Sequence, residues 1–276
     1  MPSLRQSLDI LQKTHERSIE SDPIFFPRQF SNPRDQEVVA FISAMFAFGN
    51  VKAIFGTLGK IFSFLGSSPY QKILSFDASE LKTRSFPKHR WITPSDTRNL
   101  FLLLQNILRE HQSLEKSFMQ FHTNSIDQTM IQWFDFLKTI QMKLQKKNLS
   151  RGQKFLFASP KTKSSSKRLQ MFFRWVVRDE YPDLGLWKSV KSSELFIPLD
   201  VHLFQFSQHL GFTKKKQANW QAVMEITQAF RKINPQDPIR YDFSLARLGI
   251  TNLCIHANDD QYCHPCLLRE HCKLHK

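Results

Sequence analysis

The chain has 276 residues, of which 41% are hydrophobic and 26 are phenylalanines, so it is long enough and apolar enough to bury a core as one large or two modest lobes. Its formal net charge of +15 indicates a polyanionic partner, nucleic acid before membrane. Charged residues between Arg5 and Glu20 exclude the apolar core of a signal peptide, and the longest near-apolar run, 38–48, is too short to span a bilayer. We therefore expect a globular, cytoplasmic protein that does not bind membranes.

The first third of the chain contains apolar residues at helical spacing. Leu4, Leu8 and Leu11 share one face of an amphipathic helix that we predict over 4–20. The segment 38–48 is apolar all round, which predicts a buried helix.

Capping signals and apolar periods predict further helices along the chain. A helix over 54–65 follows the buried one, and Thr93 offers a capping hydroxyl directly before Pro94, which suits the first position of a helix. Another apolar period extends over 130–144. Every clear period is 3.6 residues and none is 2, so the predicted fold class is all-α.

The segment between Asp135 and Asp179 has twelve lysines and arginines and no acidic residue. It includes a loop of lysines and serines that opens onto a helix predicted over 167–177. Unpaired N–H groups at a helix start, together with hydroxyls and amines, suit phosphate groups. The predicted contacts with the DNA backbone are Lys161, Lys163, Ser164, Ser165, Ser166 and Arg168. The alternative is a basic face that contacts only solvent.

Asp200 occupies the position of a helix N-cap. Pro198 restricts the approach of the chain, and Val201, Phe204 and Leu210 follow with helical spacing. Two roles are open for this carboxylate. It is either a helix cap that contributes about 1 kcal/mol of stability, or a group that the helix start positions to act on a substrate.

All the cysteines of the chain lie near its C-terminus: Cys254, Cys263, Cys266 and Cys272. In a reducing compartment, cysteines crowded in this way indicate metal ligands rather than disulfides. Four thiolates favour a 4Fe–4S cluster, although zinc also accepts four cysteines. A mixed zinc site is a further alternative that would use the nearby histidines His256, His264, His271 and His275. In each case we expect the metal to be structural.

The segment 199–211 reads LDVHLFQFSQHLG, and the cysteines follow it with the spacing C-x8-C-x2-C-x5-C. Together these motifs resemble the helix-hairpin-helix DNA glycosylase superfamily, which includes endonuclease III and the adenine glycosylases. The resemblance covers 35–65 weakly and 165–272 well, and it is closest to an uncharacterised bacterial subgroup.

The resemblance implies two helical lobes and a C-terminal metal-cluster loop. The central lobe comprises 36–178 and contains the phosphate-binding loop and helix. The terminal lobe comprises 1–35 and 179–276 and carries both Asp200 and the four cysteines.

The resemblance also implies a monomeric base-excision glycosylase that acts on double-stranded DNA with a damaged base. Asp200 is the expected catalytic carboxylate, and Lys167 is the expected nucleophile of an accompanying AP lyase activity through a Schiff base. The superfamily often has a glutamine that fills the gap left by an extruded base, and this sequence has Met45 and Phe46 there. Asn50 is therefore the expected DNA contact that fills the gap, unless the DNA is opened differently. The two hairpin glycines of the superfamily are absent before Lys167.

Two alternatives stay open. In the first, Lys167 contacts a phosphate group and is not a nucleophile. In the second, the whole chain is a non-catalytic DNA- or RNA-binding protein on the same iron–sulfur scaffold. The sequence does not reveal the lesion, the opposite base or whether RNA is accepted.

Overall fold

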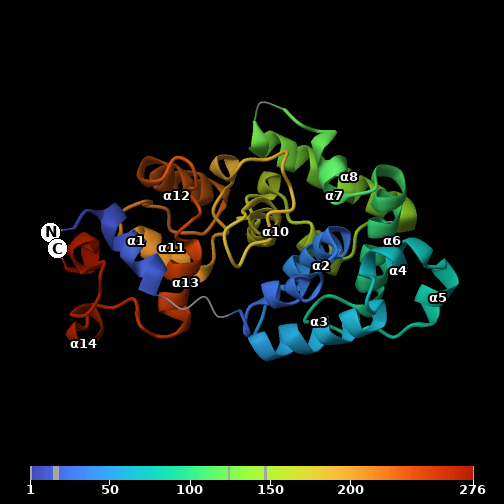
Figure 1. Cartoon of the computed structure of the whole chain (residues 1–276), viewed down its shortest axis with the longest axis horizontal. Helices are drawn as coiled ribbons and strands as arrows, with labels where there is room; N and C mark the ends of the chain where they lie inside the picture. The colour runs from blue at the N-terminus through green and yellow to red at the C-terminus, as the bar shows by residue number, and fades with distance from the viewer. Residues whose placement is uncertain (1, 15–18, 124, 146–147, 276) are drawn as a thin grey trace. The chain divides into compact units, whose positions relative to one another are not determined.

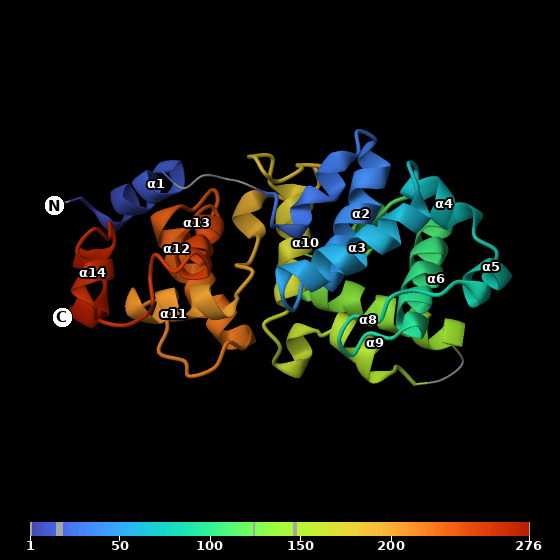
Figure 2. The ribbon, with the colours of Figure 1, turned by 90° about the horizontal axis from the view of Figure 1, so that it is seen from below.

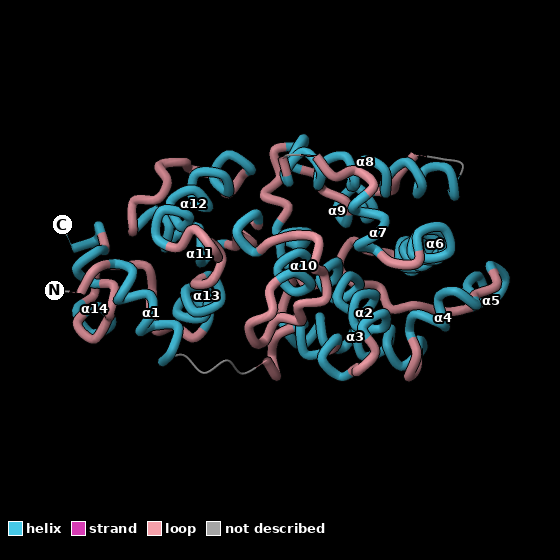
Figure 3. Tube along the Cα trace, turned by 45° about the horizontal axis from the view of Figure 1, so that its top comes forward, coloured by secondary structure: helices cyan, strands magenta, loops and turns pink. Residues whose placement is uncertain are grey.

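A computed structural model describes residues 2–14, 19–123, 125–145 and 148–275 of the chain. These residues form helices, turns and loops, and they contain no β-strand (Figures 1 and 3). Two isolated bridges occur, one between His89 and Ile92 and one between Ser164 and Asn219. The predicted all-α class is confirmed.

The chain divides into two compact units. Within the described residues, one unit is drawn from 1–17, 163–174 and 191–276, and we call it the terminal unit. The other is drawn from 18–162 and 175–190, and we call it the central unit. Each unit therefore combines segments that are far apart in the sequence.

These boundaries differ from the predicted lobes in three segments. Residues 19–35 and 179–190 were predicted in the terminal lobe and belong to the central unit, whereas 163–174, which contains Lys167, was predicted in the central lobe and belongs to the terminal unit. The indole Nε1 of Trp187 donates a hydrogen bond of 2.7 Å to Glu37. The backbone N–H groups of Lys188 and Ser189 donate to one carboxylate oxygen of Glu115, at 2.9 and 3.1 Å. The carboxylates of Glu37 and Glu115 thus hold 179–190 in the central unit. The sequence pattern did not indicate these contacts.

The central unit contains most of the helices of the chain. Its α-helices are α2 (Pro33–Phe46), α3 (Val51–Leu65), α4 (Pro69–Ser75), α5 (Ala78–Thr83), α6 (Pro94–His111), α7 (Leu114–Met119), α8 (Ile126–Gln145) and α9 (Arg151–Leu156), and its 3-10 turns are η1 (Pro23–Phe25), η2 (Pro27–Gln29) and η3 (Pro160–Thr162). In Figure 2, α2 lies beside α3, and α6 packs on α4 and α8. Every residue from 38 to 46 is buried, so the buried helix that its composition predicts is confirmed.

Side-chain caps explain where several of these helices begin. The Thr93 Oγ1 accepts from the N–H of Asp96 at 3.2 Å, and the Asp96 carboxylate accepts from the N–H of Thr93 at 2.8 Å. This reciprocal pair forms a capping box, and it confirms the helix start that Thr93 and Pro94 predict. Asn50 caps α3, because its Oδ1 accepts from the N–H of Ala53 at 2.8 Å.

The terminal unit is built around three helices that follow one another along the chain. Its elements are α1 (Leu4–Thr14), the first eight residues of α10 (Lys167–Val177), η4 (Ser192–Glu194), α11 (Val201–His209), α12 (Trp220–Ile233), α13 (Asp242–Ile250), α14 (Asp260–Cys263), η5 (Arg269–His271) and η6 (Lys273–His275). Helix α13 packs against α11 and α1. The predicted opening helix over 4–20 ends at Thr14, and residues 15–18 lie outside the described part of the chain.

Candidate active site

Asp200 is the N-cap of α11, as its sequence context predicts. Its Oδ1 accepts a hydrogen bond of 2.8 Å from the backbone N–H of Leu203. Its other oxygen, Oδ2, lies 3.8 Å from the Nζ of Lys167. One oxygen of the carboxylate therefore stabilises the helix, while the other faces an amine.

Lys167 is the first residue of α10, so the amine and the carboxylate are each anchored at the start of a helix. The side chain of Lys167 is 37% exposed and that of Asp200 is 18% exposed. Substrate can therefore reach both groups from solvent. The partial positive charge at the helix starts favours a carboxylate and a bound phosphate at this place.

Some of the predicted phosphate contacts lie in the loop that leads into α10 and Lys167. Lys163 is exposed and adopts a left-handed backbone conformation with a φ of 59°. Ser164 and Ser165 are half-buried, and the Oγ of Ser164 accepts from the N–H of Ser166 at 3.1 Å. These residues belong to the terminal unit together with Lys167 and Asp200.

Of the other predicted contacts, one is buried and two belong to the central unit. Arg168 is only 9% exposed, and its burial lowers the pKa of the guanidinium to about 9. Lys161 belongs to the central unit, where its Nζ lies 2.6 Å from the carboxylate of Asp135. Asn50 also belongs to the central unit, and its side chain caps α3. Lys163, Ser164 and Ser165 thus belong to the same unit as Lys167 and Asp200 and are accessible, whereas Ser166 is only 5% exposed.

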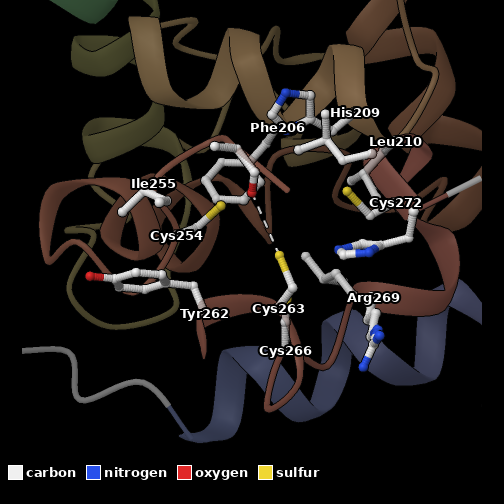
Figure 4. Close-up of a pocket in the computed structure, with 14 residues that line it drawn as sticks. Phe206, His209, Leu210, Cys254, Ile255, Tyr262, Cys263, Cys266, Arg269 and Cys272 are labelled. Atoms are coloured by element: carbon white, nitrogen blue, oxygen red, sulfur yellow. Dashed lines mark hydrogen bonds between the residues drawn. The ribbon is translucent and has the colours of Figure 1, made fainter. Parts of the chain in front are cut away.

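The four cysteines lie around one pocket of the terminal unit (Figure 4). All four are half-buried, and the pocket is closed on one side by Phe206, His209 and Leu210 at the end of α11. In Figure 4 the thiols of Cys254, Cys263 and Cys272 point into this space. The C-terminal loop therefore gathers its thiols around a single cavity.

The pKa values of two thiols reflect this gathering. Burial raises the pKa of Cys254 and of Cys266, and the charges of the neighbouring cysteines raise each of them further. Among the described residues, no three histidine, cysteine, aspartate or glutamate side chains converge closely enough to hold a single metal ion. The thiols therefore surround the cavity without meeting at one point.

His256 joins the cysteine loop to α11. Its ring lies 5.8 Å from that of His202, 4.6 Å from that of Phe206 and 5.4 Å from that of His209, measured between centroids. These three partners share one face of α11. Burial, and then the charges of His209 and His202, lower the pKa of His256 to about 4, so its ring is neutral at pH 7.

The sequence supplied His256 only as an alternative zinc ligand, whereas the structure gives it a packing role between the cysteine loop and α11. The sequence signal for this contact is the spacing of His202, Phe206 and His209, which places three rings on one face of the helix where another aromatic side chain can pack. Since Asp200 caps the same helix, the cysteine loop supports the element that positions the carboxylate.

These features define an all-helical protein with an amine and carboxylate pair at two helix starts and a four-thiol pocket. A family model described as "Protein of unknown function (DUF2400)" matches residues 22–251. The chain belongs to this family. The matched segment includes Lys167 and Asp200 and ends before Cys254. No curated protein and no solved structure matches the chain.

The family match overturns the resemblance to the helix-hairpin-helix DNA glycosylase superfamily, which is wrong as a family assignment. The motifs that carried it are short, and the hairpin glycines on which that assignment depends are absent from the sequence. None of the described helices is long and apolar enough to cross a membrane.

Proposed function

We propose that this protein is a DNA base-excision glycosylase that releases a damaged base by cleaving its N-glycosidic bond, with AP lyase activity through Lys167. The observation that carries the proposal is the 3.8 Å separation between Lys167 Nζ and Asp200 Oδ2 in a partly exposed site. The proposal rests on the chemistry of these two groups and does not depend on kinship to known glycosylases.

The pair supplies the two groups that this reaction requires. Loss of a base leaves positive charge on the sugar, which a fixed carboxylate stabilises. In its neutral form the Lys167 amine attacks C1′ of the sugar as the bond to the base breaks, and the base leaves with the bonding electrons and takes up a proton. Asp200 would accept the proton that the amine loses on forming the new bond, through one intervening water or after a small side-chain movement that closes the 3.8 Å separation.

The net charge of the chain and the lysine and serines of the loop before α10 support a DNA partner. The formal net charge is +15, and Lys163 and the partly exposed serines Ser164 and Ser165 lead into α10. Phosphate groups bind to amines, hydroxyls and N–H groups of this kind. The target base has to leave the stack before the pair reaches its sugar, at a cost of a few kcal/mol.

We also propose that Cys254, Cys263, Cys266 and Cys272 hold a 4Fe–4S cluster. In such a cluster each thiolate binds a different iron atom, so the four sulfur atoms surround the cluster and do not meet at one ion. All four cysteines line one pocket, which is the arrangement that such a cluster requires. The cluster would tie down the loop that carries His256 against α11.

The test is a panel of duplexes that contain uracil, 8-oxoguanine, an alkylated base or an abasic site, scored for alkali-labile or cut strands. We expect cleavage at one or more of these sites, and we expect Asp200→Asn to lower base release at least about 100-fold while DNA binding is retained. A protein that binds the duplexes but cleaves none of them would instead be a non-catalytic nucleic-acid-binding protein.

A further inference from the structure

The central unit contains a surface cluster that the proposed function does not use. Trp91 is half-exposed, and the guanidinium carbons of Arg90 and Arg151 lie 4.6 and 5.7 Å from the centroid of its ring. Phe48 stacks on Trp91 at 5.9 Å, and Phe155 meets it edge-on at 4.9 Å. We call these five residues the Trp91 cluster.

The turn that carries Arg90 is fixed in place. His89 is buried, its Nε2 lies 2.8 Å from the carbonyl oxygen of Phe48, and its Nδ1 lies 3.0 Å from the hydroxyl of Thr57. His89 and Ile92 also exchange backbone hydrogen bonds of 2.9 and 3.0 Å. Arg90 therefore projects from a short turn that is anchored to the end of α2 and to α3.

Close packing against Gly49 further restricts the position of Arg90. Gly49 has a φ of 102°, which favours glycine, and a Cβ at this residue would lie 3.3 Å from the Cδ of Arg90. Arg90 itself has a φ of 54°. A left-handed residue that is not glycine costs free energy, so the surrounding contacts hold Arg90 in place against this strain.

The part of the chain that the structure describes offers no counter-charge to these two guanidiniums. Arg90 and Arg151 are exposed, and across the described residues neither guanidinium forms an ion pair or a hydrogen bond. The carboxylate nearest in sequence to this region, that of Asp96, is buried and accepts from Thr93 and Ser150. Lys88 and Lys154, which are also exposed, flank the two arginines in the sequence and add charge of the same sign.

We propose that the Trp91 cluster binds the sugar–phosphate backbone of a nucleic acid, with Arg90 and Arg151 on phosphate groups of one strand. Guanidiniums ordered on an aromatic ring lose less side-chain freedom when they bind, and their planar forks match phosphate oxygens. The half-exposed rings of Trp91, Phe48 and Phe155 offer apolar surface to the sugars and bases. This binding site goes beyond the proposed function, because it does not depend on whether Lys167 and Asp200 are catalytic.

The double variant Arg90→Gln/Arg151→Gln tests the proposal against a matched control. Arg34 and Arg84 also belong to the central unit, are exposed, and lie over the rings of Tyr70 and Phe64 at 5.3 and 4.7 Å. Arg34→Gln/Arg84→Gln therefore removes the same charge and the same kind of aromatic contact. Both variants are compared with the wild type by fluorescence anisotropy on undamaged duplex DNA at several salt concentrations.

We expect the slope of log Kobs against log salt to flatten by about 1.8 in Arg90→Gln/Arg151→Gln, since each phosphate contact contributes about 0.9. The control pair should change the slope by much less. Equal changes in the two variants would contradict the proposal, because they would show that only the net charge matters. Asp200→Asn should leave the slope nearly unchanged, so a failure of the proposed catalysis is distinguishable from a failure of this binding site.

Tryptophan fluorescence provides a second, local measurement. Trp133, Trp175 and Trp187 are buried, so in a Trp220→Phe background the half-exposed Trp91 is the tryptophan whose emission can respond to a surface ligand. When duplex DNA is added, the Trp91 emission should change in the Trp220→Phe protein. It should not change when Arg90→Gln and Arg151→Gln are added to that protein. An identical change with inorganic phosphate alone would overturn the proposal in favour of a small-anion site.

Discussion

The Nη1 of Arg174 lies 2.6 Å from the Oδ1 of Asp242, and their side chains are only 7% and 3% exposed. This buried ion pair joins α10 to α13, and α13 packs against α11. Lys167 begins α10 and Asp200 caps α11, so the pair of Arg174 and Asp242 helps to fix the distance between the two candidate reactive groups. The sequence pattern did not predict that these two residues pair.

Asp242→Asn should destabilise the protein by about 3–5 kcal/mol, because it leaves the buried charge of Arg174 without this carboxylate. Urea unfolding followed by circular dichroism measures the change. The control is Arg5→Gln, which removes an exposed pair with Asp9 at 3.9 Å and should cost less than about 1 kcal/mol. Equal losses in the two variants would show that the buried pair does not hold α10 in place.

Gly249 of α13 lies directly against His202 of α11. A Cβ at Gly249 would lie 2.7 Å from the Cγ of His202, which is closer than real contacts allow. Gly249→Ala should therefore destabilise the terminal unit by about 1–3 kcal/mol by forcing the helices apart. Thermal unfolding provides the measurement.

Gly56 is the matched control for this substitution. It lies within α3, and a Cβ added there meets nothing within 4 Å. Gly56→Ala should raise stability by about 0.5–1 kcal/mol, since alanine loses less backbone freedom in a helix. If both variants were stabilised, the close packing of α11 on α13 would be refuted.

Glu37 should make stability depend on pH. Burial raises its pKa above the ordinary value of 4.5, although Leu114, Glu115 and Trp187 donate hydrogen bonds to it. As pH rises above 4.5, the unfolded chain loses this proton before the native protein does, so this group reduces the free energy of unfolding until pH passes the raised pKa.

Glu37→Gln removes this titration. The free energy of unfolding of the wild type, relative to that of Glu37→Gln, should therefore fall between pH 4 and pH 7. Chemical denaturation at a series of pH values gives this difference. A difference that rises with pH would mean that the three donors outweigh burial and lower the pKa.

The proposed cluster predicts a colour and a metal content. Protein purified without chelators should absorb broadly near 400 nm and contain iron, and Cys263→Ser should lose both the absorbance and solubility, because ligation contributes to folding. Arg269→Gln, a change beside the pocket that removes no thiol, should retain the iron. Colourless protein with stoichiometric zinc after anaerobic reconstitution would contradict the cluster.

The sequence predicted the features that depend on local patterns. The apolar run in α2, the capping box of Thr93 and Asp96, and the N-cap role of Asp200 follow from the spacing of a few neighbouring residues. The proximity of Lys167 to Asp200 was expected only from the resemblance to the DNA glycosylase superfamily. The family match shows that this family assignment is wrong.

The sequence missed the features that depend on contacts between distant segments. Nothing in the local pattern pairs Trp187 with Glu37, so the assignment of 179–190 to the central unit could not be predicted. Nor did the basic run reveal that Arg168 is buried or that Arg151 lies over Trp91, because a charge pattern contains no information about side-chain burial.

The central claim is that Lys167 and Asp200 form a reactive pair, and borohydride trapping on abasic or damaged duplex DNA tests it most directly. We expect the wild type to give a covalent protein–DNA adduct, Lys167→Gln to give none, and Lys163→Gln, which removes the exposed amine of the neighbouring loop, to retain it. An adduct that persists in Lys167→Gln, or a wild type that releases a base and is never trapped, would contradict the nucleophilic role of Lys167.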